Sequence, residues 1–405
     1  MQSGPNRSVV ITGLGCVTPL GNSVSEFWSA LLGGRSGAGP VKSFDPAAYR
    51  THVGCEVKDF TPPGERTRGR AAQLAMVAGK EALRSAGIET ESEGLMLGVS
   101  IGTTMGEANF LDRLTDTSHD TVTAPWAEVL THSAYSITSD VAEGLGIEGP
   151  QASLPAACSA GNYAVGLALD WIRQGQSDLV LAGGAEAFSE SAFAGFNRLS
   201  AMSPERCRPF DRDRQGLLLG EGAALMLLES EDHARRRGAQ ILARVLGYGL
   251  SCDAHHITGP HPEGKGAAAC MRNALQDSHA DVMDVGYLCC HGTGTQQNDR
   301  IEAMAIHKVF GERARRLPVS SIKALTGHMM GAASAAEGIA CVLALKDGVL
   351  PPTCNHENLD PECLLDVIPN QPRELRVRLI LNNSYAFGGN NACVAFGAWP
   401  GVAQK

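Results

Sequence analysis

The sequence predicts a mixed α/β fold made of two similar halves. Short apolar stretches typical of strands alternate along the 405 residues with helical stretches rich in small side chains, which is the pattern of layered α/β proteins. A weak internal repeat supports the two halves. In each, a strand-like stretch leads through a tight turn into a small-residue helix, at residues 154–174 and again at 319–345. We expect an N-terminal half at residues 1–240 and a C-terminal half at 241–405, packed face to face.

The individual elements follow from local composition. Stretches rich in valine, isoleucine and leucine predict strands at Val9–Gly13, Leu95–Ile101, Leu179–Ala182, Ala223–Glu229, Ile241–Leu250, Val285–Cys290, Pro318–Ser321, Leu379–Ser384 and Ala392–Gly397. Longer stretches rich in alanine and leucine predict helices at Val24–Leu32, Arg70–Ala86, Gly161–Gln174, Lys265–Ser278, Arg300–Phe310 and Ala332–Asp347.

Composition limits the function. With 43% hydrophobic and 19% charged residues, the chain is neither disordered nor a coiled coil. A net charge of -9 argues against a general nucleic-acid partner. The polar residues 1–8 lack a signal-peptide core, and no apolar stretch reaches membrane-spanning length. We therefore expect a cytoplasmic protein with no membrane partner. Its cysteines, none spaced as C-x-x-C, should be reduced, with no bound metal.

Cys158 is the first candidate for chemistry. It follows a strand-like stretch and precedes a helix that we expect to begin near Ser159. The partial positive charge of a helix N-terminus favours a thiolate at this place. Its neighbours Ala157, Ala160 and Gly161 are small enough to let an acyl chain approach the sulfur. The alternative is a buried, inert cysteine, which we expect of most other cysteines in the chain.

Two histidines stand at turns where α/β proteins place their sites. His291 follows a predicted strand and opens the loop His-Gly-Thr-Gly-Thr, in which Thr293 and Thr295 offer hydroxyl groups. His328 opens the second small-residue helix, and Lys323 just before it can hold a carboxylate or lower the proton affinity of a neighbour. The alternatives are a core histidine, a helix-capping histidine and a solvated lysine.

A glycine-rich loop at residues 383–391 is the last candidate element. Two glycines follow Phe387, and glycines allow a close backbone approach. Backbone N–H groups in such a turn can face an oxyanion, although most turns of this kind are structural. A thiol, two imidazoles, a lysine and this loop together favour acyl transfer followed by carbanion chemistry.

These motifs resemble one family over nearly the whole chain, from Val9 to about Gly397. The chain is similar to the β-ketoacyl-acyl-carrier-protein synthases, the elongating condensing enzymes of the Cys-His-His type. The resemblance rests on Val-Ile-Thr-Gly-Leu-Gly-Cys-Val-Thr-Pro-Leu-Gly (10–21), Ala-Cys-Ser-Ala-Gly (157–161), Ala-Gly-Gly-Ala-Glu (182–186), Arg-Pro-Phe-Asp-Arg-Asp-Arg-Gln-Gly (208–216), Gly-Glu-Gly-Ala (220–223), His-Gly-Thr-Gly-Thr (291–295), Lys323 with Gly-His (327–328) and Phe-Gly-Gly (387–389).

The resemblance implies a fold and a set of partners. The fold would be the thiolase fold, two similar halves in a five-layer αβαβα arrangement. The substrates would be carried on the phosphopantetheine of a partner acyl carrier protein, and no cofactor would be bound to this chain. The chain would form a homodimer across a strand of its N-terminal half, or a heterodimer with a related chain-length partner.

The resemblance also implies catalytic roles. Cys158 would accept the acyl group, and His291 and His328 would hold the malonyl thioester oxygen and assist decarboxylation. Lys323 would orient His328 and Glu337.

Further roles concern the walls of the site. Phe387 would gate the site, and its backbone N–H would form the oxyanion hole with that of Cys158. The phosphopantetheine contacts would be Thr258, Thr293 and Thr295.

Several positions depart from the family pattern. Ala386 replaces the usual glycine, Asn390 the usual threonine, Met329 a threonine or leucine, and Gly259 a serine that binds pantetheine in the fatty-acid enzymes. The positions that line the acyl tunnel in such enzymes are Met105, Glu107 and Phe196. We count Met105, Phe196 and Asn390 among the expected substrate contacts. The departures, above all a charged Glu107, suggest a polyketide or another specialised acyl chain.

An acidic carrier protein needs a local basic surface. The candidates are Arg66, Arg68 and Arg70, and a second cluster of Arg206, Arg208, Arg212 and Arg214. Solvated arginines, or Arg–Asp pairs within residues 208–214, are the alternative.

Other functions remain as alternatives. A thiolase carries a second catalytic cysteine in the C-terminal glycine-rich loop, where this chain has Phe387. A non-catalytic chain-length partner lacks the nucleophile, whereas Cys158 and both histidines are present here. The histidines His255, His256 and His261 lack further ligands at metal-binding spacing apart from Asp253.

Overall fold

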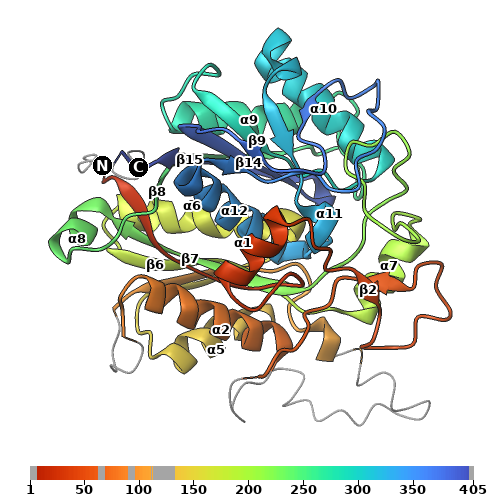
Figure 1. Ribbon diagram of the computed structural model, residues 1–405. Helices are drawn as coiled ribbons and strands as arrows, with labels where there is room; N and C mark the ends of the chain where they lie inside the picture. Colours follow the sequence, from red (N-terminus) through yellow and green to blue (C-terminus); the bar gives the residue numbers. More distant parts are fainter. Residues whose placement is uncertain (1–6, 63–68, 90–95, 111, 113–132, 401–405) are drawn as a thin grey trace, which may run out of the picture.

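The computed structural model describes residues 7–62, 69–89, 96–110, 112 and 133–400 (Figure 1). Most of their strands form one sheet, in the order β12-β10-β9-β14-β15-β8-β1-β7-β6-β4-β5. The strands are β1 (Val9–Val17), β4 (Gly98–Gly102), β5 (Gln151–Leu154), β6 (Leu179–Glu186), β7 (Gly222–Ser230), β8 (Ala243–Cys252), β9 (Val285–Cys289), β10 (Pro318–Ser320), β12 (Asp366–Val367), β14 (Leu379–Tyr385) and β15 (Asn390–Ala398). Within the described ranges, no helix is long and apolar enough to cross a membrane.

The sheet contains the same pattern twice. Strands β1-β7-β6-β4-β5 lie side by side in the first half, and β8-β15-β14-β9-β10 repeat that order in the second. In both, the last three strands are parallel and the first three are antiparallel. The two patterns meet where β1 pairs with β8 in an antiparallel register. The predicted repeat is therefore present in the strand topology.

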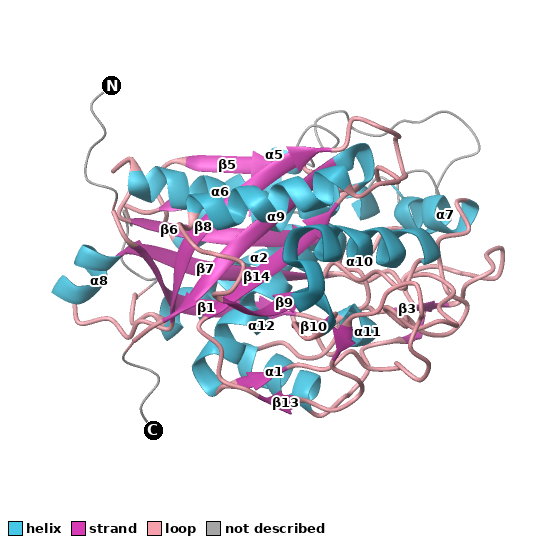
Figure 2. Cartoon of the chain, turned by 90° about the horizontal axis from the view of Figure 1, so that it is seen from above, coloured by secondary structure: helices cyan, strands magenta, loops and turns pink. Residues whose placement is uncertain are grey.

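Helices separate the two halves of the sheet into layers (Figures 1 and 2). Helices α2 (Arg70–Ser85) and α5 (Ala134–Leu145) cover the outer face of the first half, and α9 (Lys265–Asp277) and α10 (Gln296–Phe310) that of the second. Between the halves lie α6 (Ala160–Arg173) and α12 (Ala333–Asp347). Residues 333–345 of α12 are all buried, as expected of a helix that is apolar on every side.

Two glycines, one in β4 and one at the start of α6, allow this layering. A Cβ on Gly102 of β4 would lie 2.2 Å from the carbonyl carbon of Ala160, where α6 begins. A Cβ on Gly161 would lie 2.9 Å from the backbone nitrogen of Ala335 in α12. The central helices can therefore approach the sheet and each other only because these positions lack side chains.

The remaining elements are short or peripheral. They are α1 (Val24–Leu32), α7 (Glu190–Arg198), α8 (Glu231–Arg236) and α11 (Lys323–Thr326), with the two-stranded pairs β2 (Gly39–Pro40) with β3 (Val53–Gly54) and β11 (Val349–Leu350) with β13 (Arg373–Glu374). The sequence did not predict α5, α7, α8 or β5. The predicted strand Leu95–Ile101 begins at a residue outside the described ranges, and β4 runs from Gly98 to Gly102. The predicted helix Arg300–Phe310 begins earlier, at Gln296, because the Thr295 side chain caps it.

Candidate active site

Cys158 lies at a strained turn between β5 and α6. The preceding Ala157 has a φ of +50°, a left-handed conformation that costs a non-glycine residue free energy. The turn is held from the other half of the molecule, because Ser384 Oγ donates to the Cys158 carbonyl (2.9 Å) and Ser159 Oγ donates to the Asn390 carbonyl (2.7 Å). Met330, before α12, has a φ of +49°, so the same strained turn precedes both central helices.

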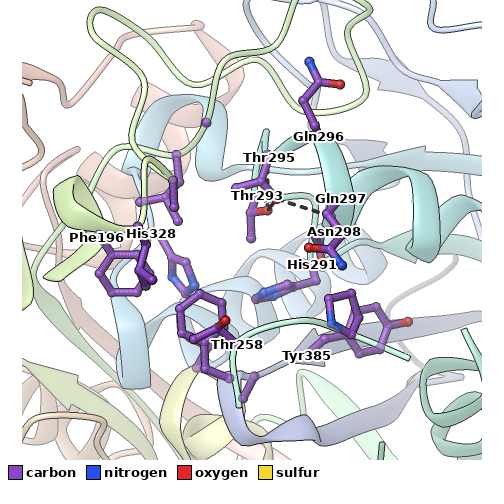
Figure 3. A pocket seen from close by; sticks show the side chains of 18 of the residues that line it. Phe196, Thr258, His291, Thr293, Thr295, Gln296, Gln297, Asn298, His328 and Tyr385 are labelled. Carbon is purple, nitrogen blue, oxygen red and sulfur yellow. Dashed lines mark hydrogen bonds between the residues drawn. The ribbon is translucent and has the colours of Figure 1, made fainter. Parts of the chain in front are cut away.

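A cavity of about 310 Å³ leads from the surface to this cysteine (Figure 3). Exposed residues such as Leu199 and Gln297 line its mouth, and Cys158, His291 and His328 lie at its buried end. Residues from both halves thus meet at one place, as the sequence predicted. A narrow passage to a buried thiol suits a substrate carried on a long, thin arm.

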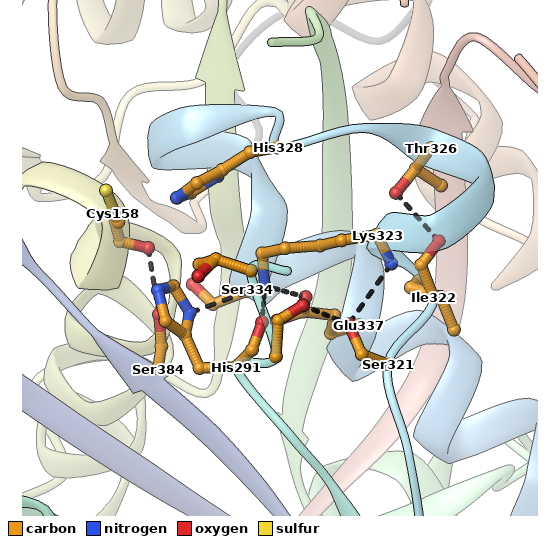
Figure 4. Close-up of polar contacts among 12 residues, drawn as sticks. Cys158, His291, Ser321, Ile322, Lys323, Thr326, His328, Ser334, Glu337 and Ser384 are labelled. Atoms are coloured by element: carbon orange, nitrogen blue, oxygen red, sulfur yellow. Dashed lines mark hydrogen bonds and ion pairs between the residues drawn. The ribbon is translucent and has the colours of Figure 1, made fainter. Parts of the chain in front are cut away.

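The two imidazole rings lie 5.3 Å apart, centroid to centroid. Behind them, Lys323 Nζ donates to the His291 carbonyl (2.7 Å), lies 3.3 Å from His291 Nδ1 and forms a buried ion pair with Glu337 (Figure 4). On the other side, Glu302 of α10 accepts from the backbone N–H of His291 (2.8 Å). These contacts fix the His291 ring at the end of β9.

Both histidines are neutral in this site. Burial lowers the pKa of His291 and of His328 well below the usual value, and the positive charge of Lys323 lowers both further. For Lys323 itself, burial lowers the pKa, but the attraction of Glu337 outweighs burial and raises it overall. Lys323 therefore keeps its charge while the imidazoles remain uncharged.

Hydrogen bonds also fix the tautomers. His328 Nδ1 accepts from the backbone N–H of Met330 (3.2 Å), and His291 Nδ1 faces the charged Lys323 amine. Since Nδ1 is the acceptor in both rings, Nε2 carries the hydrogen. The site therefore offers two neutral N–H donors side by side.

The Cys158 thiol is harder to ionise than its place near a helix N-terminus suggested. Burial raises its pKa to about 12, and this outweighs the lowering by Lys323 and by the backbone N–H groups of Phe387 and Cys158 itself. The expected preference for a thiolate in the resting protein is therefore wrong. Those two N–H groups nevertheless lie close to the sulfur, beside the place where the carbonyl oxygen of a bound acyl group would become an oxyanion.

This pKa has a direct consequence for alkylation of Cys158. The rate of iodoacetamide alkylation should rise steadily with pH between 7 and 9.5, because the thiolate fraction increases without reaching a plateau. The measurement is the mass of the modified peptide after timed exposure. A rate that levels off near pH 7 would show that the thiol is already ionised there.

The expected pantetheine contacts lie along the cavity wall. Thr258, Thr293 and Thr295 all line it, and the Thr293 and Thr295 hydroxyls are 2.9 Å apart. Gln297, which no sequence motif indicated, also lines the cavity, and its amide nitrogen lies 3.3 Å from the position that a Cβ on Gly259 would take. The Gln297 amide thus lies beside position 259, where this chain has glycine and the enzymes it resembles commonly have serine.

Two expected substrate contacts do not reach this cavity. Neither Met105, whose side chain is 38% exposed, nor Asn390 is among the residues that line it, and the Asn390 carbonyl holds the Cys158 turn. Phe196 does line the cavity and stacks on Phe387, with ring centroids 5.4 Å apart. The carboxylate of Glu107 accepts from backbone N–H groups at the start of α2, so it serves as a helix cap and gives no support to an unusual acyl chain.

The arginine clusters are largely engaged in ion pairs. Arg70 pairs with Glu221, and Arg212 with Asp213. Arg206 and Arg208 both pair with Glu357, and Arg214 is buried against Asp299 and Asp360. Arg66 and Arg68 lie outside the described residues. Of the Arg–Asp pairs expected within residues 208–214, only Arg212–Asp213 is present; the other arginines of the second cluster pair with acidic residues far along the chain.

No group of three or more His, Cys, Asp or Glu side chains suited to a metal ion occurs in the described part of the chain. His255 and His261 lie near each other, with ring centroids 5.2 Å apart. His256 Nδ1 accepts from the backbone N–H groups of Thr258 and Gly259. These two hydrogen bonds shape the loop that contains Thr258, one of the residues that line the cavity.

Comparison with known proteins agrees with this geometry. Residues 6–234 match the family Beta-ketoacyl synthase, N-terminal domain, and residues 242–357 match Beta-ketoacyl synthase, C-terminal domain. The chain belongs to the β-ketoacyl synthase family. The thiolase fold with its five αβαβα layers, expected from the motifs, is thereby confirmed.

Three relatives illustrate the range of the β-ketoacyl synthase family. The 3-oxoacyl-[acyl-carrier-protein] synthase 2 of Coxiella burnetii is 39% identical, over 95% of this chain and 97% of that protein. The structure titled "The ishigamide ketosynthase/chain length factor" is 40% identical, with a TM-score of 0.90 over 97% of this chain and 100% of that one. A type II PKS ketosynthase in complex with its acyl-carrier protein, "AntDE:AntF", is 31% identical, with a TM-score of 0.90 over the same shares.

Sequence motifs did not reveal every residue that supports the site. Glu302 and Asp299 are buried, lie one helical turn apart in α10 and face the His291 loop. Their spacing just after the His-Gly-Thr-Gly-Thr motif was a signal that the sequence contained. Glu186 ends the Ala-Gly-Gly-Ala-Glu motif, but nothing local indicates which backbone groups it contacts.

Proposed function

We propose that this chain is a β-ketoacyl-acyl-carrier-protein synthase, which joins an acyl group held on Cys158 to a malonyl unit by decarboxylative Claisen condensation. The observation that carries the proposal is the meeting of a buried thiol and two neutral imidazole N–H donors at the end of one narrow cavity. Acylation and decarboxylation each develop an oxyanion, and the site has a separate pair of donors for each.

The first half-reaction loads the enzyme. Cys158 Sγ attacks the carbonyl carbon of an acyl thioester, and the bond to the sulfur of the carrier arm breaks. The proton of the Cys158 thiol leaves with the released arm thiol. The backbone N–H groups of Cys158 and Phe387 would stabilise the tetrahedral oxyanion.

The second half-reaction extends the chain. Loss of carbon dioxide from malonyl thioester leaves its electron pair as an enolate, whose oxygen accepts from Nε2–H of His291 and His328. The enolate carbon attacks the acyl carbonyl, and the bond to Cys158 breaks. The released thiolate takes a proton from water. Lys323 and Glu337 would hold the histidines in the required form.

The substrate arm and partners are part of the proposal. Phosphopantetheine of an acyl carrier protein would pass Thr258, Thr293, Thr295 and Gln297, with Phe387 as the gate. The complexes of two relatives support a carrier-protein partner and a heterodimer with a chain-length factor. A homodimer stays a prediction. Polyketide or fatty-acid type elongation is the proposed pathway class. The boundary at residue 240, a cytoplasmic location, and substrate contacts at Met105 and Asn390 stay predictions.

Intact-protein mass spectrometry tests the proposal. Incubation with an acyl-loaded carrier protein should add one acyl group to the protein at Cys158, and malonyl carrier protein should then release it as a β-ketoacyl product. Cys158→Ala should abolish both, because no other described cysteine lines the cavity. An acyl adduct that survives in this variant would contradict the assignment, and Cys252→Ala, at the exposed cysteine, is the matched control.

A further inference from the structure

Glu186, the last residue of β6, is a buried carboxylate that the proposed mechanism leaves without a role. Its side chain is 1% exposed. It accepts from the backbone N–H groups of Thr104 (2.7 Å), Met105 (2.9 Å) and Gly331 (2.9 Å), and from the Thr103 hydroxyl (3.3 Å). Hydrogen bonds to a buried carboxylate are among the strong ones in proteins. Glu186 thus ties the loop after β4 to the turn before α12.

The Gly331 contact holds a strained turn in place. Met330, the preceding residue, has a φ of +49°, which a non-glycine residue adopts only when its surroundings impose it. A Cβ on Gly331 would lie 2.5 Å from the Thr103 Cα. The turn therefore packs against the end of β4, and the Gly331 N–H group binds it there to Glu186.

The same turn sets the chemical form of His328. The backbone N–H of Met330 is the donor to His328 Nδ1, at 3.2 Å. Figure 4 shows the His328 ring pointing toward Cys158. If the turn relaxed, Nδ1 would lose its donor and the ring could take its other tautomer. Nε2 would then present a lone pair where the enolate oxygen forms, and stabilisation would become repulsion.

We propose that Glu186 is a positioning residue for the condensation step, because it holds the Met330–Gly331 turn and thereby keeps His328 in its Nε2–H form. This inference rests on the proposed function. Glu186 touches neither the substrate nor the reacting atoms. Since the acylation of Cys158 does not use His328, loss of the turn should slow only the second half-reaction. The negative charge of Glu186 raises the pKa of Cys158, so removing that charge should not slow acylation.

The test is Glu186→Gln, measured separately in the two half-reactions. A carboxamide has one acceptor oxygen, so it cannot serve the Gly331 and Met105 donors from two oxygens as the carboxylate does. Loss of one charge-assisted hydrogen bond predicts about a tenfold lower condensation rate, with acylation of Cys158 no slower than in wild type. In ¹⁵N spectra of histidine-labelled protein, assigned with His328→Ala, the Nε2–H signal of His328 should weaken.

Glu107→Gln is the matched control. Glu107 is also buried, and its carboxylate accepts from the backbone N–H groups of Ala71 and Ala72, in the outer helix α2. It follows Met105 in the same loop, so it controls for disturbance of that loop. This variant should lower the melting temperature but leave the ratio of condensation to acylation unchanged.

Equal losses in both half-reactions of Glu186→Gln, or an unchanged His328 signal, would overturn the positioning role. If that variant does not fold, the wild-type spectrum decides, because a His328 ring protonated at Nδ1 contradicts the proposal. Failure of the wild type to acylate Cys158 would instead contradict the proposed function, and the tautomer measurement would still test the role of Glu186.

Discussion

Replacing Arg214 with methionine should lower the free energy of unfolding by about 3–5 kcal/mol, because it leaves a buried charge without its partner. Arg214 is 1% exposed and lies between Asp299 and Asp360. Its guanidinium also donates to the carbonyls of Thr295 (3.1 Å) and Gln296 (3.0 Å). The change removes these donors while Asp299 stays fully buried, so both a charge and backbone acceptors are left unsatisfied.

Equilibrium urea unfolding of the two proteins measures this difference. Arg212→Met is the control, since Arg212 is exposed and pairs at 3.4 Å with the exposed Asp213. A pair of that kind contributes about 0–1 kcal/mol. If the Arg214 and Arg212 variants unfold at the same urea concentration, the buried network does not stabilise the fold.

Arg214 also shows where sequence reasoning fails. In the sequence it is one of several arginines in a charged stretch, and it was therefore a candidate for binding the carrier protein. Its burial depends on Asp299 and Asp360, which lie far along the chain and approach it only in the folded protein. A side chain's solvent exposure is a property of the tertiary structure, and local sequence gives little information about it.

The central helices and the reactive residues were predictable for the opposite reason. Glycine and alanine around Cys158 and after His328 are local signals of close helix packing, and the repeat of this pattern predicted two halves. The ionisation of Cys158 was not predictable, because helix position and burial act in opposite directions on its pKa. Only the structure shows that burial is the larger effect.

Replacing Lys323 with methionine should reduce the rate of condensation by about a hundredfold or more. A positioned acid or base contributes a factor of at least about a hundred to a rate, and Lys323 supports such a group. Lys323 Nζ supports His291 at both the carbonyl and Nδ1, and its positive charge lowers the pKa of that ring. Its charge also lowers the pKa of Cys158. Alkylation of Cys158 at a fixed pH should therefore slow as well, which the peptide-mass assay measures.

The double variant Lys323→Met/Glu337→Gln separates catalysis from folding. In the single variant Glu337 is buried without a cation, and the free energy of unfolding should fall by about 3–5 kcal/mol. Removing both charges should restore most of that stability, because a neutral amide in place of the carboxylate costs less to bury. Condensation should stay low in the double variant, because His291 still lacks its partner. Recovery of condensation together with stability would mean that Lys323 acts only on the fold.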